Sequence, residues 1–262
     1  MHKLVMIVGA VAALAAAAEG PIVRSHRGSR GEYDDNARGG FVKCLENGVR
    51  YFETDVRWTK DHRLVIMHDG NVERTTLGKG NISQMTEAEV RACRLKRSGE
   101  PVPTVAEVAS VFKGRKDVQV EWELKEYFKG KDCEDYCKQV YETVSSIMEP
   151  GTYIFICFAP HMLATMKRLY PNAPIGLNVD RALTNEITDK ALALGCESVQ
   201  PYLSSSKESI AYAHSKGLRV GVWMVNNLDQ WHRARDIGAD ACTCDYPMTL
   251  SLAIASEVKS KK

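Results

Sequence analysis

One stretch of the chain carries acidic and basic side chains at spacings that allow them to act together. In ETDVRWTKDHRLVIMHD, Glu53 and Asp55 are two residues apart, and His68 follows the apolar run LVIM. Alternate side chains on a β-strand point to the same face, so both carboxylates share one face. The pattern predicts a buried strand with a charged face and a histidine at the end of the next apolar run.

A second strand-like stretch, VQVEWELK, repeats the pattern with Glu121, Glu123 and Lys125. Carboxylates that converge in a buried place repel one another and lose hydration unless a cation neutralises them. A hard divalent cation with oxygen ligands does so, and Ca²⁺ or Mg²⁺ is the natural choice. Surface salt bridges are the alternative and would be favoured for an isolated acidic pair. Acidic residues on two neighbouring strands favour the interpretation as a metal site.

Two histidines stand at the ends of apolar runs. His26 follows PIVRS, and His68 follows LVIM. Imidazole titrates near neutral pH, so such residues suit general acid/base catalysis. Arg27 and Lys125 add fixed positive charge. A metal, two cationic side chains and two histidines together suit hydrolysis of a phosphate ester.

Apolar, β-rich runs alternate with helix-like segments along most of the chain. We expect strands at residues 21–26, 49–56, 118–125, 152–158, 173–179, 196–203, 218–225 and 239–244. Eight such strands separated by helices predict a closed parallel (β/α)8 TIM barrel, with the site at the C-terminal ends of the strands. Trp223 lies near the end of the seventh expected strand.

Residues 59–104 interrupt the alternation. They hold a short apolar run, a glycine-containing turn region and a basic helix-like stretch. We expect a small insertion between the second and third barrel strands that covers one end of the barrel. There is no Ser/Gly-rich linker, so residues 19–262 are predicted to form a single domain.

The first 18 residues have the features of a secretory signal peptide. A basic start at Lys3 precedes an apolar run and a string of alanines. A membrane anchor is the alternative, but the uncharged run is short for a span of ~20 residues. We therefore expect cleavage near Ala18, export to the periplasm or beyond, and no stable membrane span afterwards.

Charge and cysteine content bear on nucleic-acid binding, disulfides and zinc sites. The 35 basic and 33 acidic residues nearly balance, and the basic ones are scattered, which argues against a nucleic-acid binder. Eight cysteines in an exported protein can include disulfides, but the spacing does not give the pairing. Cys133 and Cys137 in CEDYC lack the partners of a zinc site, so ordinary thiols or one disulfide are favoured.

The order of the motifs resembles that of the glycerophosphodiester phosphodiesterase family. The resemblance covers nearly the whole mature chain through HRG (26–28), ETDVRWTKDHRLVIMHD (53–69), RTTLGKG (74–80), GEPVPTVAEV (99–108), ELK (123–125), VGVWMVN (220–226) and GADACTCDYP (238–247). HRG alone is a weak signal, whereas all of these motifs in this order are specific. The resemblance implies a barrel with a small inserted segment and a divalent cation, often Ca²⁺ or Mg²⁺.

The resemblance also assigns expected roles to eight residues. It implies metal ligands at Glu53, Asp55 and Glu123, an acid/base pair at His26 and His68, phosphate contacts at Arg27 and Lys125, and an aromatic pocket wall at Trp223. The implied reaction cleaves a small-molecule glycerophosphodiester into glycerol 3-phosphate and an alcohol. A glycerol hydroxyl attacks phosphorus, one histidine takes its proton, the other protonates the alcohol, and water then opens a cyclic phosphate. Which histidine acts first stays open.

Some positions depart from the family pattern. Asp35 stands in place of the glutamate of a PEN-T segment and Ala37 in place of its threonine. The shorter carboxylate is expected to make looser contacts or contacts through water. Cys157 and Cys244 replace serine and threonine, and Glu121 matches no family ligand. The alternatives are another substrate, namely a lysophospholipid, glycerophosphoinositol or a wall polymer, or a non-catalytic barrel that binds a phosphorylated ligand.

Overall fold

A closed barrel of parallel strands forms the centre of the molecule. The computed structural model describes residues 20–260, and within them the barrel consists of β1 (Ile22–Ser25), β2 (Tyr51–Trp58), β4 (Gln119–Leu124), β5 (Tyr153–Cys157), β6 (Ile175–Asn178), β7 (Ser198–Gln200), β8 (Arg219–Val222) and β9 (Ala241–Cys244). Each strand pairs in parallel with the next, and β1 pairs with both β2 and β9, which closes the ring. The predicted (β/α)8 barrel is confirmed.

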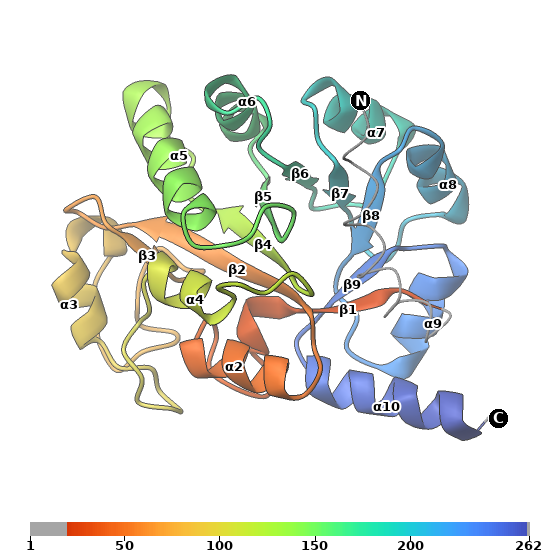
Figure 1. Ribbon diagram of the computed structural model, residues 1–262, viewed down its shortest axis with the longest axis horizontal. Coiled ribbons are helices and arrows are strands. Elements are labelled where there is room, and N and C mark those ends of the chain that lie inside the picture. The colour runs from red at the N-terminus through yellow and green to blue at the C-terminus, as the bar shows by residue number, and fades with distance from the viewer. Residues whose placement is uncertain (1–19, 261–262) are drawn as a thin grey trace.

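Helices surround the strands, as Figure 1 shows. They are α2 (Arg38–Glu46), α4 (Val105–Val111), α5 (Gly130–Ser145), α6 (Pro160–Leu169), α7 (Asn185–Ala193), α8 (Lys207–Ser215), α9 (Leu228–Asp236) and α10 (Pro247–Ser260). Side-chain oxygens of Thr104, Thr184, Ser206 and Asn227 cap the N-termini of α4, α7, α8 and α9. The main apolar core fills the layer between these helices and the outer face of the barrel.

The outward side of β2 belongs to this core. The rings of Phe52 and Phe112 lie 4.8 Å apart, and Phe41 of α2 lies 6.0 Å from Phe112. All three side chains are fully buried. Burial of these rings on one face fixes the register of β2, so the alternate residues Glu53 and Asp55 must point into the barrel.

Residues 59–104 leave the barrel after β2 and return before α4. They contain β3 (Leu64–Ile66), which runs antiparallel to β2, the 3₁₀-helix η2 (Ile82–Gln84) and α3 (Glu87–Ala92). This segment has its own apolar cluster, with Val65, Met67, Ile82 and Leu95 among its members, and Figure 1 shows α3 beyond β2 and β3. The backbone N–H of Met67 donates to the carbonyl of Asp55 at 3.0 Å, which places His68 beside the end of β2.

The structure leaves the predicted signal peptide untested, because residues 1–18 lie outside the described residues. Within residues 20–260, no helix has both the length and the apolar character needed to cross a bilayer. The same range contains all eight cysteines, and each is a free thiol. Neither a disulfide nor a cysteine zinc site therefore forms at Cys133 and Cys137 in the described structure.

Candidate active site

Three carboxylates meet at the C-terminal end of the barrel. Glu53 and Asp55 point inward from β2, and Glu123 points inward from β4, where it is the register partner of Asp55. One oxygen of each carboxylate lies within 4.8 Å of one oxygen of both others, and all three side chains are buried. The structure thus brings together the three residues that the sequence predicted as metal ligands.

The electrostatics of this triad call for a cation. Burial, and then the negative charge of Asp55, raises the pKa of Glu53 well above its usual value. Burial also raises the pKa of Glu123 to about 7, although Lys125 opposes the shift. Burial alone would raise the pKa of Asp55 as well, but Lys125 and Arg27 lower it overall. Glu53 Oε1 has no hydrogen-bond partner. This carboxylate oxygen is therefore available to coordinate a divalent cation.

Two fixed cations flank the triad. Lys125 Nζ lies 2.6 Å from Glu123 Oε1 and 3.1 Å from Asp55 Oδ1. Arg27 Nε lies 3.3 Å from Asp55 Oδ2. The side chains in these ion pairs are at most 9% exposed, so the alternative of solvent-exposed salt bridges does not describe them. Both side chains line the cavity at the barrel mouth, where an anionic phosphate would meet them.

His26 is delivered by a tight turn that ends β1. Residues His26–Gly28 form a 3₁₀ turn in which Gly28 has a φ of +65°, a conformation that glycine adopts without strain. His26 Nδ1 lies 2.6 Å from Asp245 Oδ1. A carboxylate at this distance requires the hydrogen on Nδ1, which leaves Nε2 free to accept a proton. Burial lowers the pKa of His26, against the opposing effect of Asp245.

His68 has the same arrangement on the other side of the site. Its Nδ1 lies 2.7 Å from Asp69 Oδ1, and Arg74 Nε donates to Asp69 Oδ2 at 2.5 Å. Arg57 Nε donates to the carbonyl of His68 at 3.0 Å and fixes the backbone there. Burial lowers the pKa of His68 to about 4. Each imidazole therefore has a carboxylate at Nδ1, and burial lowers the pKa of both.

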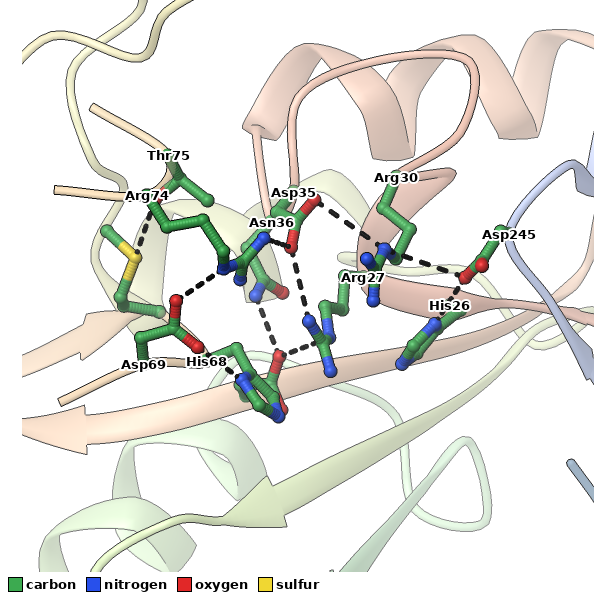
Figure 2. A network of polar contacts seen from close by, with 12 residues as sticks. His26, Arg27, Arg30, Asp35, Asn36, His68, Asp69, Arg74, Thr75 and Asp245 are labelled. Carbon is green, nitrogen blue, oxygen red and sulfur yellow. Dashed lines mark hydrogen bonds and ion pairs between the residues drawn. The ribbon is translucent and has the colours of Figure 1, made fainter. Parts of the chain in front are cut away.

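Figure 2 shows that polar contacts join the two histidines into one arc. Asp35 lies at its centre, with Oδ2 3.2 Å from Arg27 Nη1 and 3.0 Å from Arg74 Nη1. Arg30 Nε stands 3.9 Å from Asp35 Oδ1 and 3.7 Å from Asp245 Oδ1. Of the two expectations for Asp35, looser contacts or contacts through water, the second does not describe Arg27 and Arg74, because the carboxylate reaches both guanidinium groups directly.

Trp223 forms part of the cavity wall. Its indole Nε1 donates to the carbonyl of Gln200 at 2.8 Å, and its ring meets Phe158 edge-on with centroids 6.0 Å apart. The cavity has a volume of about 240 Å³, and both histidines, Glu53 and Glu123 line it. Charged groups of both signs and an apolar wall thus face the same small space.

Sequence reasoning missed several residues that support this site. Asn36 Nδ2 donates to Asp55 Oδ2 at 2.8 Å, and Thr54 Oγ1 donates to Asn36 Oδ1 at 2.9 Å. Asp69 and Asp245 lie behind the histidines, and these positions were not predicted. The adjacency in His68-Asp69 was the available signal for one of them; the other pairing joins residues 219 positions apart.

Comparisons with known proteins agree on one family. Residues 26–249 match the model of the glycerophosphoryl diester phosphodiesterase family. A glycerophosphodiester phosphodiesterase of Caldanaerobacter subterraneus subsp. tengcongensis is 28% identical over 87% of this chain and 96% of its own length. A human lysophospholipase D is 24% identical over 86% of this chain and 83% of its own length.

A solved structure shares the fold. The phosphodiesterase of Oleispira antarctica, in complex with the product sn-glycerol-3-phosphate, superposes with a TM-score of 0.81 at 24% identity, over 90% of this chain and 97% of that one. The family match spans the barrel strands from β2 to β9, the inserted segment and all residues of the site described above. The chain belongs to the glycerophosphoryl diester phosphodiesterase family.

Proposed function

We propose that this phosphodiesterase cleaves glycerophosphodiesters into glycerol 3-phosphate and an alcohol, with His26 and His68 as the acid/base pair and a divalent cation at Glu53, Asp55 and Glu123. The observation that carries the proposal is the pair of imidazoles, each with a carboxylate at Nδ1, which line the same cavity as Glu53 and Glu123. Family membership supports the reaction class.

The three carboxylates fit a hard cation such as Ca²⁺ or Mg²⁺. They are buried, their oxygens converge, and burial opposes ionisation of Glu53 and Glu123 in the absence of a positive charge. When bound, the cation would stabilise negative charge on the phosphate oxygens. Four other oxygens of the triad are held by Asn36, by the backbone N–H of Arg27 and by the ammonium of Lys125.

The protein's own cations bind and orient the phosphate. Arg27, from the turn after β1, offers guanidinium N–H groups to the cavity, and Lys125, from the end of β4, offers an ammonium. Both are held in place by carboxylates, so little side-chain freedom is lost when substrate binds. The Trp223 ring covers the apolar wall and excludes water from that side.

The histidines move the protons. One imidazole Nε2 accepts the proton of the glycerol hydroxyl next to the phosphate, and that oxygen attacks phosphorus. The other imidazole, whose protonated form the anionic diester favours, gives its proton to the departing alcohol. A water molecule then opens the cyclic phosphate with the two roles exchanged. His26 and His68 are equivalent in this scheme until the order of their action is measured.

The test is a panel of glycerophosphodiesters assayed for release of glycerol 3-phosphate. Glycerophosphocholine and glycerophosphoethanolamine are incubated with the protein, then with EDTA, then with Ca²⁺ or Mg²⁺ restored. We expect activity that EDTA abolishes and one of the two cations restores. Undiminished activity in EDTA would contradict the proposed metal dependence. If no diester released glycerol 3-phosphate, the proposed reaction would be wrong.

We also propose that the protein is exported. The basis is the sequence of residues 1–18, with one basic residue followed by an apolar, alanine-rich run. Sequencing the N-terminus of the protein isolated from its source cells is the test. A mature N-terminus close to Glu19 supports export, whereas a chain that retains its first residues argues for an uncleaved anchor or no export.

A further inference from the structure

The barrel interior beneath the site is polar, which is unusual because such barrels are filled mainly by branched apolar side chains. Arg24 Nη1 and Glu121 Oε2 form an ion pair at 2.7 Å, with both side chains only 3–4% exposed. Arg24 Nη1 also donates to Thr243 Oγ1 at 3.2 Å, and Gln200 Nε2 donates to Glu121 Oε1 at 3.2 Å. These residues and Asn178 line the same cavity as the histidines.

Two inward glycines make room for this polar layer. A Cβ on Gly221 would lie 2.3 Å from Arg24 Nη2, and a Cβ on Gly176 would lie 2.6 Å from Ser198 Oγ and 3.3 Å from Gln200 Nε2. Any larger residue at either position would displace the polar side chains. The two glycines therefore leave the space that the polar side chains occupy at this depth of the barrel.

The layer below closes the barrel. Tyr51 donates to Gln119 in a short hydrogen bond, and Arg219 Nη1 donates to Gln119 Oε1 at 3.1 Å. The Arg24 guanidinium stacks over the Tyr51 ring, 5.7 Å from its centroid. The cavity thus has an open end at the histidines and a closed end at the side chains of Arg24, Glu121, Asn178 and Gln200, which we call the floor.

The floor has unused hydrogen-bonding capacity of both kinds. Asn178 Oδ1 and Gln200 Oε1 can accept, and Arg24 Nε can donate, yet none of these buried atoms has a hydrogen-bond partner in the described structure. Buried polar atoms without partners cost stability unless water or a ligand satisfies them. The one cation and one anion of the floor neutralise each other, so the floor favours an uncharged group that both donates and accepts. A hydroxyl has that property.

We propose that the floor binds the distal hydroxymethyl group of the substrate's glycerol moiety, so that the enzyme selects deacylated glycerophosphodiesters over those with an acyl chain on glycerol. The inference rests on the proposed function. An acyl chain on that hydroxyl would remove its proton and would have to enter a closed polar space within a cavity of about 240 Å³, below the roughly 300–1,000 Å³ of drug-sized ligand pockets.

The order of events places glycerol at the closed end. The alcohol leaves first, while glycerol remains attached to phosphorus as the cyclic phosphate. Water must then reach phosphorus from the side that the alcohol has vacated, so the alcohol has to face the open end. The glycerol moiety is left to face the floor, with Ile156 and Phe158 in the wall beside it.

The test compares two diesters on the unmodified enzyme: glycerophosphocholine and the choline phosphodiester of ethylene glycol. The second retains the hydroxyl that attacks phosphorus and the same leaving group, but it lacks the distal hydroxymethyl group. We expect kcat/KM to be lower by about tenfold or more for the glycol diester, because polar atoms of the floor stay unpaired. Lysophosphatidylcholine is expected to be an even poorer substrate.

Variants then assign the effect to the floor. In Gln200→Leu and Asn178→Leu, which change different strands, kcat/KM for glycerophosphocholine should fall about tenfold while that for the glycol diester changes less than about threefold. Gln139→Leu is the matched control, since Gln139 hydrogen-bonds Trp58 and the backbone of His62 outside the cavity. It should leave the ratio between the two substrates unchanged.

The outcomes separate the two proposals. If the unmodified enzyme hydrolyses neither diester, the proposed function fails. If it hydrolyses both with equal kcat/KM, or prefers lysophosphatidylcholine, the proposed function stands. The floor then does not recognise the hydroxymethyl group, and the inference is wrong. A Gln200→Leu enzyme that folds and keeps the full preference for glycerophosphocholine also overturns the inference.

Discussion

The carboxylate of Asp35 bridges Arg27 and Arg74, with one oxygen 3.2 Å from a guanidinium nitrogen of the first and 3.0 Å from one of the second. Arg74 holds Asp69 behind His68, and Arg27 lies against Asp55 of the acidic triad. A single acid thus contacts both Arg27 and the arginine that holds Asp69 behind His68 (Figure 2).

Removal of Asp35 should lower activity without unfolding the protein. In Asp35→Ala, Arg27 and Arg74 lose a shared counter-ion, so kcat/KM is expected to fall about ten- to a hundredfold through loss of positioning. Asp35→Glu keeps the charge and should retain activity within a few fold. Asp180→Ala, which changes an exposed acid paired with Arg181, is the control. Steady-state kinetics with glycerophosphocholine measures all three; an Asp35→Ala enzyme as active as the control would show that the bridge has no part in catalysis.

The carboxylate behind His26 should matter for turnover more than for binding. Asp245 Oδ1 lies 2.6 Å from His26 Nδ1 and keeps the imidazole hydrogen on that nitrogen. In Asp245→Asn the amide can donate to Nδ1 and turn the proton-accepting nitrogen away from substrate, so kcat should fall by roughly a hundredfold or more while KM changes little. A kcat within threefold of the unmodified enzyme would contradict the assigned tautomer.

Cation binding should stabilise the fold independently of activity. Ca²⁺ or Mg²⁺ bound to Glu53, Asp55 and Glu123 would favour the native state, because the unfolded chain does not hold the three oxygens together. We expect the melting temperature to rise with cation concentration and to fall when EDTA is added. The same titration on Glu53→Gln should give a smaller shift. Equal shifts in both proteins would place the cation elsewhere.

Most of the barrel could be predicted because strand alternation is a local property of the sequence. The ends of the strands were less predictable. The sixth expected strand, at residues 196–203, is shortened to Ser198–Gln200, since Pro201 has no N–H with which to continue the ladder. The second strand extends to Trp58 because β3 pairs with its last residues, a contact that no local pattern reveals.

The site was predictable where neighbouring residues carried it and unpredictable where distant ones did. Strand periodicity alone places Glu53 and Asp55 on one face of β2 and places Glu123 on one face of β4. Glu121 has the same periodicity, yet it turns to Arg24, 97 positions away in the chain by residue number, and takes no part in the triad. Only the closed barrel decides which of two inward glutamates meets an arginine and which meets other acids.

Acid should weaken one specific contact outside the site. Glu107, at the N-terminus of α4, pairs with Arg91 and accepts the N–H of Thr104 at 2.8 Å. Hydrogen bonding to Arg91 lowers the pKa of Glu107 to about 2, against some desolvation. A lowered pKa means that the contribution is present above the usual pKa of about 4.5 and is lost as the pH falls toward 2.

The corresponding variant is Glu107→Gln. Because the Glu107 side chain is 41% exposed, solvent screening limits its contribution to about 1 kcal/mol or less. Urea unfolding at pH 7 should show Glu107→Gln less stable by that amount, and the difference should shrink at pH 3. A difference that is the same at both pH values would indicate that charge on Glu107 has no part in it.

Release of glycerol 3-phosphate from glycerophosphocholine by a His26→Ala, His68→Ala double variant, beside the unmodified enzyme and with Ca²⁺ or Mg²⁺ present, tests the assignment of the acid/base pair. The double variant should fold, as judged by its melting temperature, and should lose activity by at least about 10⁴-fold. Full activity in the folded double variant would contradict the proposed mechanism.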